Sequence, residues 1–345
     1  MILVLAMAGA LWGIGALMKV PVRLRLGMIL MLWLGVVGLH LLLPDGHPLR
    51  VSTGGEARVW LALGVVAGIV LGYRGLVSRL RAKAAPTEVP APSGAFRPAE
   101  LDRYARHIIL REIGGPGQRK LKDSKVLVIG AGGLGSPALM YLAGAGVGVL
   151  GLVDDDMVDG SNLQRQIIHA DARIGMPKVF SAEIALRAIN PFIEIRPYRR
   201  RLDQETARAL FADYDLILDG TDNFDTRYMV NRVAVEMGKP LISGAITQWE
   251  GQVSLFHPAQ GGPCYECVFP TRPAPGMVPS CAEAGVAAPL PGVIGSIMAM
   301  EAVKQITGAG ETLKGRLMIH DALFAETRVI SVKRRADCPA CGAST

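Results

Sequence analysis

The hydrophobic residues of this chain are concentrated in its first 80 positions. Three apolar stretches without an acidic residue stand there: Met1–Met18, Leu26–Leu43 and Val59–Gly72. A helix needs about 20 apolar residues to cross a bilayer. The first two stretches have about that length, and the third reaches it only if its flank to Val77 is included. The pattern predicts a membrane region with two to three transmembrane helices, of which the third is the least secure.

Clusters of basic residues follow the first and the third stretch. They are Lys19, Arg23 and Arg25 between the first two stretches and Arg74, Arg79, Arg81 and Lys83 after the third. Such residues favour the cytoplasmic side of a membrane. Three spans then place the N-terminus and the loop Pro44–Arg58 outside and everything after Arg74 inside. A signal peptide is the alternative for the first stretch, but it expects basic residues before the apolar run. We therefore expect a protein of the inner (cytoplasmic) membrane with its catalytic domain on the cytoplasmic side.

The residues after the membrane region divide into a tether and a domain. Residues 82–98 are rich in proline and alanine, a composition typical of an extended linker. We therefore predict a membrane region over 1–81, a linker over 82–98 and one domain over 99–345. The domain has a length typical of a single nucleotide-binding fold.

A strand, turn, helix and strand pattern lies in the first part of the domain. Lys125–Ile129 reads as a buried strand, Ser136–Ala145 as a helix and Leu150–Val153 as the next strand. This βαβ unit predicts an α/β fold, a Rossmann-like and mostly parallel sheet with helices on both faces. Further predicted elements are a short helix over Arg103–Arg111, a break at Gly114–Gly117, strands at Ile193–Tyr198, Leu216–Leu218, Pro240–Ser243 and Gln252–Phe256, and a helix over Val293–Ile306.

A glycine-rich turn follows the first strand. Gly130 allows the tight turn, Gly132 lets a phosphate approach the backbone, and Gly135 lets the helix pack on the strand. Phosphate then lies at the helix N-terminus, where free N–H groups favour negative charge. Asp154 ends the second strand, where it would bind ribose hydroxyls. The pattern predicts a nucleotide site without naming the nucleotide, and an NAD-dependent oxidoreductase remains one alternative.

Two cationic residues beyond the turn favour a triphosphate. Arg165 and Lys178 would supply charge that a diphosphate does not need. On spacing alone, solvated surface charges explain them equally well. Asp219 and Asp222 follow the apolar strand Leu216–Leu218, at the end where open α/β sheets bind ligands. Asp222 as a helix cap before Phe224 is the alternative.

Four of the five cysteines form two pairs, Cys264 with Cys267 and Cys338 with Cys341. Each pair offers two thiolates at a spacing that suits tetrahedral zinc. Disulfides are the alternative, which a reducing cytoplasm disfavours. The sequence predicts a structural Zn2+ that holds the end of the chain to its body. The histidines have no ligand-like spacing, and we interpret them as structural.

From Leu101 onward the chain resembles the adenylyltransferases that activate ubiquitin-like sulfur-carrier proteins, the HesA, MoeB and ThiF type, and within it the molybdopterin-synthase branch. The resemblance rests on ordered segments that span the predicted domain. They are Arg103–Leu110, the glycine turn, Ser161–Gln166, Asp219–Asn223, Glu250–Gln252, Cys281–Gly285 and Pro291–Ser296.

The resemblance implies roles for individual residues. ATP would be surrounded by the turn and by downstream side chains, Asp222 would hold Mg2+ near the α-phosphate, and Arg106 would enter the partner subunit's site, so that the working unit is a homodimer. Cys281 aligns with a cysteine that some relatives use for a thioester or acyl disulfide, the alternative being an inert loop thiol. The residues implied around ATP are Gly133, Asp154, Ser161, Asn162, Leu163, Gln164, Arg165, Lys178, Asp222 and Asn223.

The expected function is ATP-dependent adenylation of the C-terminal Gly-Gly carboxylate of a ubiquitin-like sulfur carrier, the small subunit of molybdopterin synthase. A thiamine-pathway or other carrier is the alternative within the family. We expect a separate protein to donate the sulfur. The net charge of +7 comes partly from the membrane flanks, and lipid headgroups explain such flanks. No RNA-module signature is present in the sequence, so we expect no nucleic-acid partner.

Overall fold

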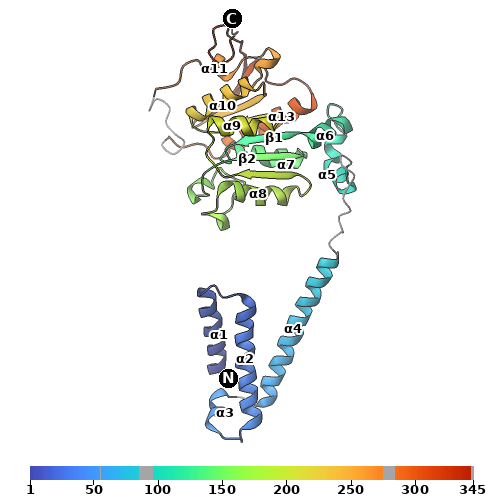
Figure 1. The fold of residues 1–345 in the computed structure, drawn as a ribbon, viewed down its shortest axis with the longest axis vertical. Coiled ribbons are helices and arrows are strands. Elements are labelled where there is room, and N and C mark those ends of the chain that lie inside the picture. Colours follow the sequence, from blue (N-terminus) through green and yellow to red (C-terminus); the bar gives the residue numbers. More distant parts are fainter. Residues whose placement is uncertain (55, 85–95, 275–283, 343–345) are drawn as a thin grey trace. The chain divides into compact units, whose positions relative to one another are not determined.

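The computed structural model describes residues 1–54, 56–84, 96–274 and 284–342, with side chains described outside 78–84. The chain divides into two compact units, Met1–Pro90 and Ala91–Thr345 (Figure 1). The predicted linker lies mostly outside the described residues. Its two ends belong to helices, because helix α4 continues to Ala84 and helix α5 begins at Pro98.

The N-terminal unit consists of helices joined by short turns. Its elements are α1 (Ile2–Leu17), α2 (Val22–Leu42), α3 (Pro48–Thr53) and α4 (Ala57–Ala84). A small buried cluster of Val4, Val36, Val37 and Trp60 holds the helices together. The ring of Trp33 covers Gly64, where a Cβ atom would lie 2.2 Å from Cζ2 of Trp33. A glycine is therefore needed at this contact between α2 and α4.

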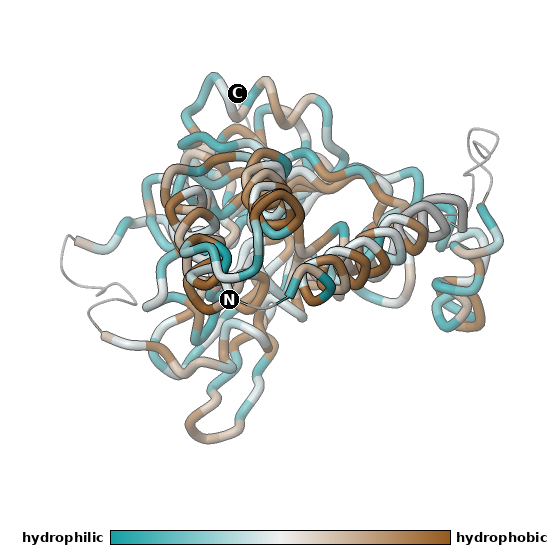
Figure 2. Tube along the Cα trace, turned by 90° about the horizontal axis from the view of Figure 1, so that it is seen from below, coloured by the Kyte–Doolittle hydropathy of each residue, from teal (hydrophilic) through white to brown (hydrophobic). Residues whose placement is uncertain are grey.

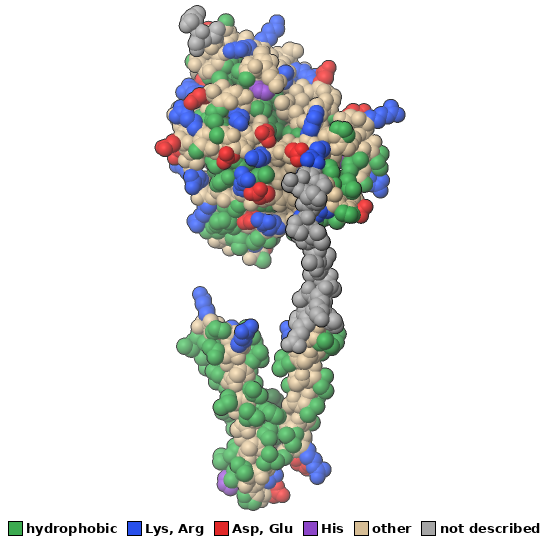
Figure 3. All heavy atoms as spheres, turned by 45° about the vertical axis from the view of Figure 1, so that its right-hand side comes forward, with side chains coloured by type: hydrophobic (Ala, Val, Ile, Leu, Met, Phe, Trp, Pro, Cys, Tyr) green, Lys and Arg blue, Asp and Glu red, His purple; other side chains and the backbone are tan. Residues whose placement is uncertain are grey.

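Two helices of this unit are long and apolar enough to cross a membrane, by length and composition alone. They are Val22–Leu42 and Ala57–Val77, whose most apolar windows are only 17% and 6% buried. A core helix of a soluble protein would be mostly buried. Here the helices consist largely of hydrophobic residues (Figure 2), and hydrophobic side chains cover the face that is visible in Figure 3. The third predicted stretch thus lies in a helix that is long enough, because α4 extends beyond the apolar run, whereas α1, which holds the first stretch, has only 16 residues.

The C-terminal unit is built on one eight-stranded sheet with the order β3-β2-β1-β4-β5-β6-β7-β8. Strands β1 to β5 pair in parallel, and β6, β7 and β8 are added as antiparallel neighbours. The strands are β1 (Lys125–Ile129), β2 (Val149–Val153), β3 (Glu194–Tyr198), β4 (Leu216–Asp219), β5 (Leu241–Ile246), β6 (Glu250–Phe256), β7 (Arg316–Asp321) and β8 (Glu326–Ser331).

Helices cover both faces of this sheet. One face packs against α7, α8 and α13 and the other against α9, α10 and α11, and each interface has its own hydrophobic core. The helices of the unit are α5 (Pro98–Ile108), α6 (Gly114–Asp123), α7 (Gly135–Ala145), α8 (Lys178–Ile189), α9 (Gln204–Ala212), α10 (Phe224–Glu236), α11 (Tyr265–Val268) and α13 (Leu290–Thr307). The predicted α/β fold with a mostly parallel sheet is confirmed.

Two predictions about elements were wrong or incomplete. The predicted break at Gly114–Gly117 is the first turn of α6, where Pro116 is acceptable because an N-terminal residue needs no intrahelical N–H partner. Strands β7 and β8 were missed. All six residues of β8 are exposed. This edge strand therefore has no alternation of buried and exposed positions, which is the pattern that predicts a strand from a sequence.

The strand order places a topological switch point beside β1. The chain passes from β1 to β2 and β3 on one side and then returns to β4 on the other side of β1. Open α/β sheets bind ligands at such a switch point, outside the carboxyl ends of the strands. The residues that follow β1 and β4 are the glycine turn and Asp219–Asn223. The fold therefore brings these two segments to the same edge.

Candidate nucleotide and metal sites

The glycine turn connects β1 to α7 with no room for side chains at two positions. Gly130 has φ +92°, a left-handed conformation that favours glycine. A Cβ atom on Gly135 would lie 1.8 Å from the carbonyl oxygen of Gly130. The space above Gly132 is open, with only Nε2 of Gln166 at 3.7 Å from a Cβ position. The N-terminus of α7 is thus presented at an open backbone, as phosphate binding requires.

The side chain of Asp154 accepts hydrogen bonds from the backbone of this turn and of the segment after β2. Its Oδ2 accepts the N–H of Ala131 at 2.8 Å, and its Oδ1 accepts the N–H of Asp156 at 2.8 Å. Burial raises the pKa of Asp154, and Lys178 acts in the opposite direction. Both carboxylate oxygens therefore already hold backbone donors. The remaining lone pairs are what Asp154 could offer to a ribose.

The segment after β2 carries the first cationic group to the turn. Asp159 caps a short 3-10 helix (Gly160–Asn162) by accepting from Ser161. The guanidinium of Arg165 donates to Oδ1 of Asn162 at 3.1 Å. Its Cγ lies 3.7 Å from a Cβ position on Gly133. Arg165 and Asn162 thus lie beside the turn, Leu163 is half-buried, and Ser161 and Gln164 are exposed.

Lys178 brings the second cationic group. It is the first residue of α8 and is only 5% exposed. Its Nζ donates to Oδ2 of Asp156 at 2.7 Å. The carboxylates of Asp154, Asp155 and Asp156 lie close enough together for a cation, but Asp154 holds backbone donors and Asp156 holds Lys178. A buried ammonium with one carboxylate partner beside an open helix N-terminus suits an anionic ligand.

A buried histidine links the turn to α8, which the sequence pattern did not single out for this site. His169 Nε2 lies 2.9 Å from the carbonyl oxygen of Ala131, and Nδ1 lies 2.9 Å from Oγ of Ser181. Because a carbonyl only accepts, Nε2 carries the hydrogen and Nδ1 accepts from the serine. Burial lowers the pKa of His169, which agrees with a neutral ring. The interpretation of this histidine as structural agrees with these contacts.

The residues after β4 complete this edge. A Cβ atom on Gly130 would lie 3.3 Å from the carbonyl oxygen of Gly220, so the two segments are in contact. Asp219 is buried and accepts from the N–H and the hydroxyl of Thr221. Asp222 is exposed, and no hydrogen bond or ion pair joins it to another described residue. Its carboxylate is available for a cation such as Mg2+.

The alternative that Asp222 caps a helix is wrong. Asn223 is the N-cap of α10, where its Oδ1 accepts the N–H of Thr226 at 2.8 Å. The cap leaves the preceding carboxylate outside the helix. Asn223 therefore has a structural reason to be present, in addition to its predicted contact with ATP.

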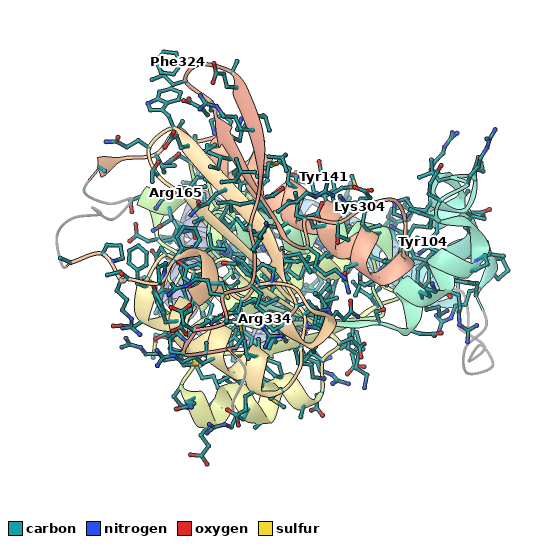
Figure 4. The ribbon with its side chains drawn as sticks, turned by 90° about the horizontal axis from the view of Figure 1, so that it is seen from above. Tyr104, Tyr141, Arg165, Lys304, Phe324 and Arg334 are labelled. Carbon is teal, nitrogen blue, oxygen red and sulfur yellow. The ribbon has the colours of Figure 1, made fainter. Side chains whose placement is uncertain are left out.

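Arg106 lies far from the glycine turn of its own chain. It is an exposed residue of α5. Nearby on α5, the hydroxyl of Tyr104 accepts from Asn190, the C-cap of α8. The helices run opposite to the parallel strands, so this C-cap marks the edge where the strands begin. Tyr104 and Arg165 lie on opposite sides of the domain (Figure 4), and Arg106 can serve a nucleotide site only in another copy of the chain.

The four paired cysteines converge into one buried cluster. The sulfurs of Cys264 and Cys338 are 3.5 Å apart, those of Cys267 and Cys341 3.3 Å, and those of Cys264 and Cys267 3.8 Å. Four thiolates at about 2.3 Å from a tetrahedral zinc ion lie about 3.8 Å from one another. The arrangement fits Zn2+ bound by the four sulfurs.

Further contacts around the cluster agree with a metal site. The disulfide alternative is wrong, because all four cysteines are free and an S–S bond needs about 2 Å. The N–H of Arg335 donates to Sγ of Cys267 at 3.4 Å. Burial raises the pKa of Cys341 to about 11, a cost that a bound dication would offset. Cys281, the fifth cysteine, lies outside the described residues.

Comparison with known proteins identifies the family. The ThiF family model matches residues 104–340. The chain belongs to the ThiF family. This match covers the sheet, the glycine turn and the cysteine cluster, and it confirms the resemblance seen in the sequence motifs.

Relatives with established descriptions are similar over the C-terminal unit. The sulfur carrier protein adenylyltransferase of Thermus thermophilus is 50% identical over 247 residues, which cover 70% of this chain and 91% of the relative. The probable adenylyltransferase/sulfurtransferase MoeZ of Mycobacterium tuberculosis is 51% identical over 251 residues, 72% of this chain. This chain spans only 64% of MoeZ. These relatives are named as enzymes of adenylyl transfer.

Solved structures show the same fold at low sequence identity. The crystal structure of E. coli MccB with MccA-N7isoASN matches with a TM-score of 0.62 at 21% identity, over 70% of this chain and 75% of that chain. The crystal structure of PaaA matches with a TM-score of 0.61 at 22% identity, over 87% and 90%. At this level of identity the likeness supports the fold alone.

Proposed function

We propose that this chain catalyses the ATP-dependent adenylation of the C-terminal Gly-Gly carboxylate of a ubiquitin-like sulfur-carrier protein. The observation that supports it most is the meeting of four features at one edge of the sheet: the open glycine turn, Arg165, Lys178 and the free carboxylate of Asp222. An adenylyl transfer needs a phosphate cradle, two or more cationic groups and a metal-binding carboxylate. The relatives named as adenylyltransferases are similar in this part of the chain.

The proposed reaction is a displacement at the α-phosphorus of ATP. An oxygen of the carrier's terminal carboxylate forms a bond to this phosphorus, and the bond to the bridging oxygen breaks as pyrophosphate leaves. Arg165 and Lys178 neutralise the charge that moves onto the leaving group, and the N–H groups of the turn orient the phosphates. Mg2+, when bound at Asp222, would supply further charge neutralisation.

The remaining cation in this proposal comes from a second copy of the chain. Arg106 is exposed, and Tyr104, on the same helix α5, lies across the domain from Arg165 (Figure 4). A homodimer would place Arg106 over the phosphates of the partner's site, as an arginine finger does in other phosphate-transfer enzymes. This role explains why an exposed arginine on α5 would matter for catalysis.

For the carrier we propose the small subunit of molybdopterin synthase. The support is the sequence resemblance to that branch and the similarity to MoeZ, whose name combines adenylyl and sulfur transfer. A thiamine-pathway carrier is the rival within the same chemistry. Sulfur would then replace AMP on the carrier, from a separate donor protein.

The test is ATP–pyrophosphate exchange with the purified full chain and a panel of Gly-Gly carriers. We expect exchange to require a carrier and to be fastest with the molybdopterin-synthase subunit. A carrier that lacks its last glycine is the control and should give none. Absence of exchange with every carrier, together with tight binding of NAD, would contradict the proposal in favour of an oxidoreductase.

We further propose that α2 and α4 anchor the enzyme in the inner membrane, with α1 packed beside them and the adenylylation site in the cytoplasm. The support is their length and their exposed apolar surface, and the basic residues that flank them. In cell fractionation, the full chain should stay in the membrane pellet after a carbonate wash, and residues 96–345 alone should stay in the supernatant. Release of the full chain by salt would contradict anchoring.

A further inference from the structure

Gln166 makes contacts that fix the polar group beside the glycine turn. Its Nε2 donates to Oδ1 of Asn162 at 3.0 Å, and Arg165 donates to the same oxygen at 3.1 Å. A guanidinium has donors only, so the Asn162 atom that faces it must be the oxygen. The Gln166 atom that faces this oxygen must then be the nitrogen. Arg165 thus determines the orientation of both amides.

The position of Gln166 adds to this evidence. The residue is 5% exposed, and its Nε2 also lies 3.7 Å from a Cβ position on Gly132. Its backbone N–H donates to the carbonyl oxygen of Asn162 at 3.0 Å. Its Oε1 is buried and has no hydrogen-bond partner among the described residues. An uncompensated buried oxygen costs free energy, so packing alone gives no reason for an amide here.

We infer that Gln166 is a positioning residue, which holds Asn162 and through it the guanidinium of Arg165 against the phosphates of the bound nucleotide. This inference rests on the proposed function. Two donors occupy Oδ1 of Asn162, so the amide cannot rotate by 180° without placing its NH2 group against two other donors. The amide nitrogen of Asn162 then stays on the side of Ser161 Oγ, 3.4 Å away, and Arg165 stays beside Gly133.

The loss of Gln166 would release this arrangement. With one of its two donors removed, the Asn162 amide is held by Arg165 alone and gains freedom to move. The guanidinium then keeps a firm contact only with the carbonyl oxygen of Ser161, which lies 3.4 Å away, and it is held less closely beside the turn. Arg165 would lose contact with the phosphates, whereas the ribose contact proposed for Asp154 does not depend on Gln166.

The test compares Gln166→Met with Gln204→Met, an exposed glutamine at the start of α9, in the full chain. Titration calorimetry measures affinity for ATP and for adenosine. We expect Gln166→Met to weaken ATP binding about tenfold, roughly 1.4 kcal/mol, and to change adenosine binding less than about twofold. Gln204→Met should change neither. In a chain that already carries Asn162→Ala, adding Gln166→Met should weaken ATP binding by less than about twofold, because Gln166 can no longer act through Asn162.

Several results would overturn the inference. Equal losses for ATP and adenosine would mean general damage to the fold, and full additivity with Asn162→Ala would mean that Gln166 acts elsewhere. Should Gln166→Met fail to fold, Gln166→Glu keeps the shape and replaces the donor by an acceptor, and it should show the same loss restricted to ATP. A wild-type chain that binds no ATP would overturn the proposed function as well. Normal ATP binding by Gln166→Met and by Gln166→Glu would overturn this inference alone.

Discussion

Two carboxylates at the nucleotide edge have different surroundings. Asp154 is enclosed, and backbone N–H groups occupy both of its oxygens. Asp222 is exposed, and Asn223 performs the helix capping that Asp222 might have performed. The sequence places both residues at the ends of strands and predicts ligand contacts for both. The structure makes Asp154 first a part of the turn itself and leaves Asp222 available for a cation.

Substitution of the free carboxylate should separate catalysis from folding. We predict that Asp222→Ala lowers the rate of ATP–pyrophosphate exchange at least about 100-fold, because the metal and the reacting phosphate lose their anchor. The thermal midpoint should be unchanged, since Asp222 is exposed and no hydrogen bond or ion pair joins it to another described residue. Asp225→Ala is the matched control, because Asp225 is exposed and pairs only with Arg272 among the described residues. Equal effects of the two changes would contradict the assignment.

At the scale of elements, β1, the glycine turn and α7 are closely packed against one another. The N-terminus of α7 can approach β1 only because Gly135 has no side chain. Gly144, in the same helix, has room for a side chain, because a Cβ atom there would meet nothing within 4 Å. Two glycines of one helix therefore have opposite expected responses to the same substitution.

For this pair we predict opposite changes in the free energy of unfolding of the C-terminal unit. Gly135→Ala should destabilise it by about 3 kcal/mol or more, because a Cβ 1.8 Å from a backbone oxygen forces the backbone to move. Gly144→Ala should stabilise it by about 0.5–1 kcal/mol, because alanine restricts the unfolded chain. Denaturant titration of residues 96–345 measures both. A neutral Gly135→Ala would show that the turn is not as tight as described.

The cysteine cluster joins α11 to the end of the chain. We predict that Cys338→Ser removes the bound zinc and lowers the melting temperature by about 5 °C or more, since metal binding contributes to folding. Elemental analysis and calorimetry measure the two quantities. Asp337→Ala, next to the cluster and exposed, should keep the metal. Full retention of zinc by Cys338→Ser would argue against four sulfur ligands.

At the scale of the whole molecule, the position of α5 decides how many chains a site needs. The contact between Tyr104 and Asn190 fixes α5 at the edge where the strands begin. The glycine turn lies where they end. A catalytic role for Arg106 is therefore compatible with this fold only if two copies associate.

A mixture of two inactive variants tests this requirement. Arg106→Ala and Asp222→Ala should each be inactive in exchange. Co-expressed in equal amounts, they should recover about a quarter of wild-type activity, because half of the dimers would be mixed and one of their two sites would be intact. The sum of the separate residual activities is the baseline. No recovery above this baseline, in a preparation shown to contain mixed dimers, would contradict action across subunits.

The sequence by itself determined the features that depend on neighbouring residues. The apolar runs, the βαβ unit and the glycine spacing follow from local sterics and the burial of side chains within one element, and the spacing of the paired cysteines predicted a metal site. It failed at β8, because an exposed edge strand has no buried face, and at Gly114–Gly117, because glycine and proline also suit the first turn of a helix.

Only the tertiary structure decided which distant residues meet. Cys264 and Cys338 are separated by 74 positions, and the contact of Gly130 with Gly220 depends on the order of the strands. The support of Asn162 by Gln166 depends on the direction of two amides, which their sequence spacing does not set. The reason is physical: the packing of helices on the sheet fixes these contacts jointly. The sequence therefore predicted the chemistry of the site, and the fold decided its geometry.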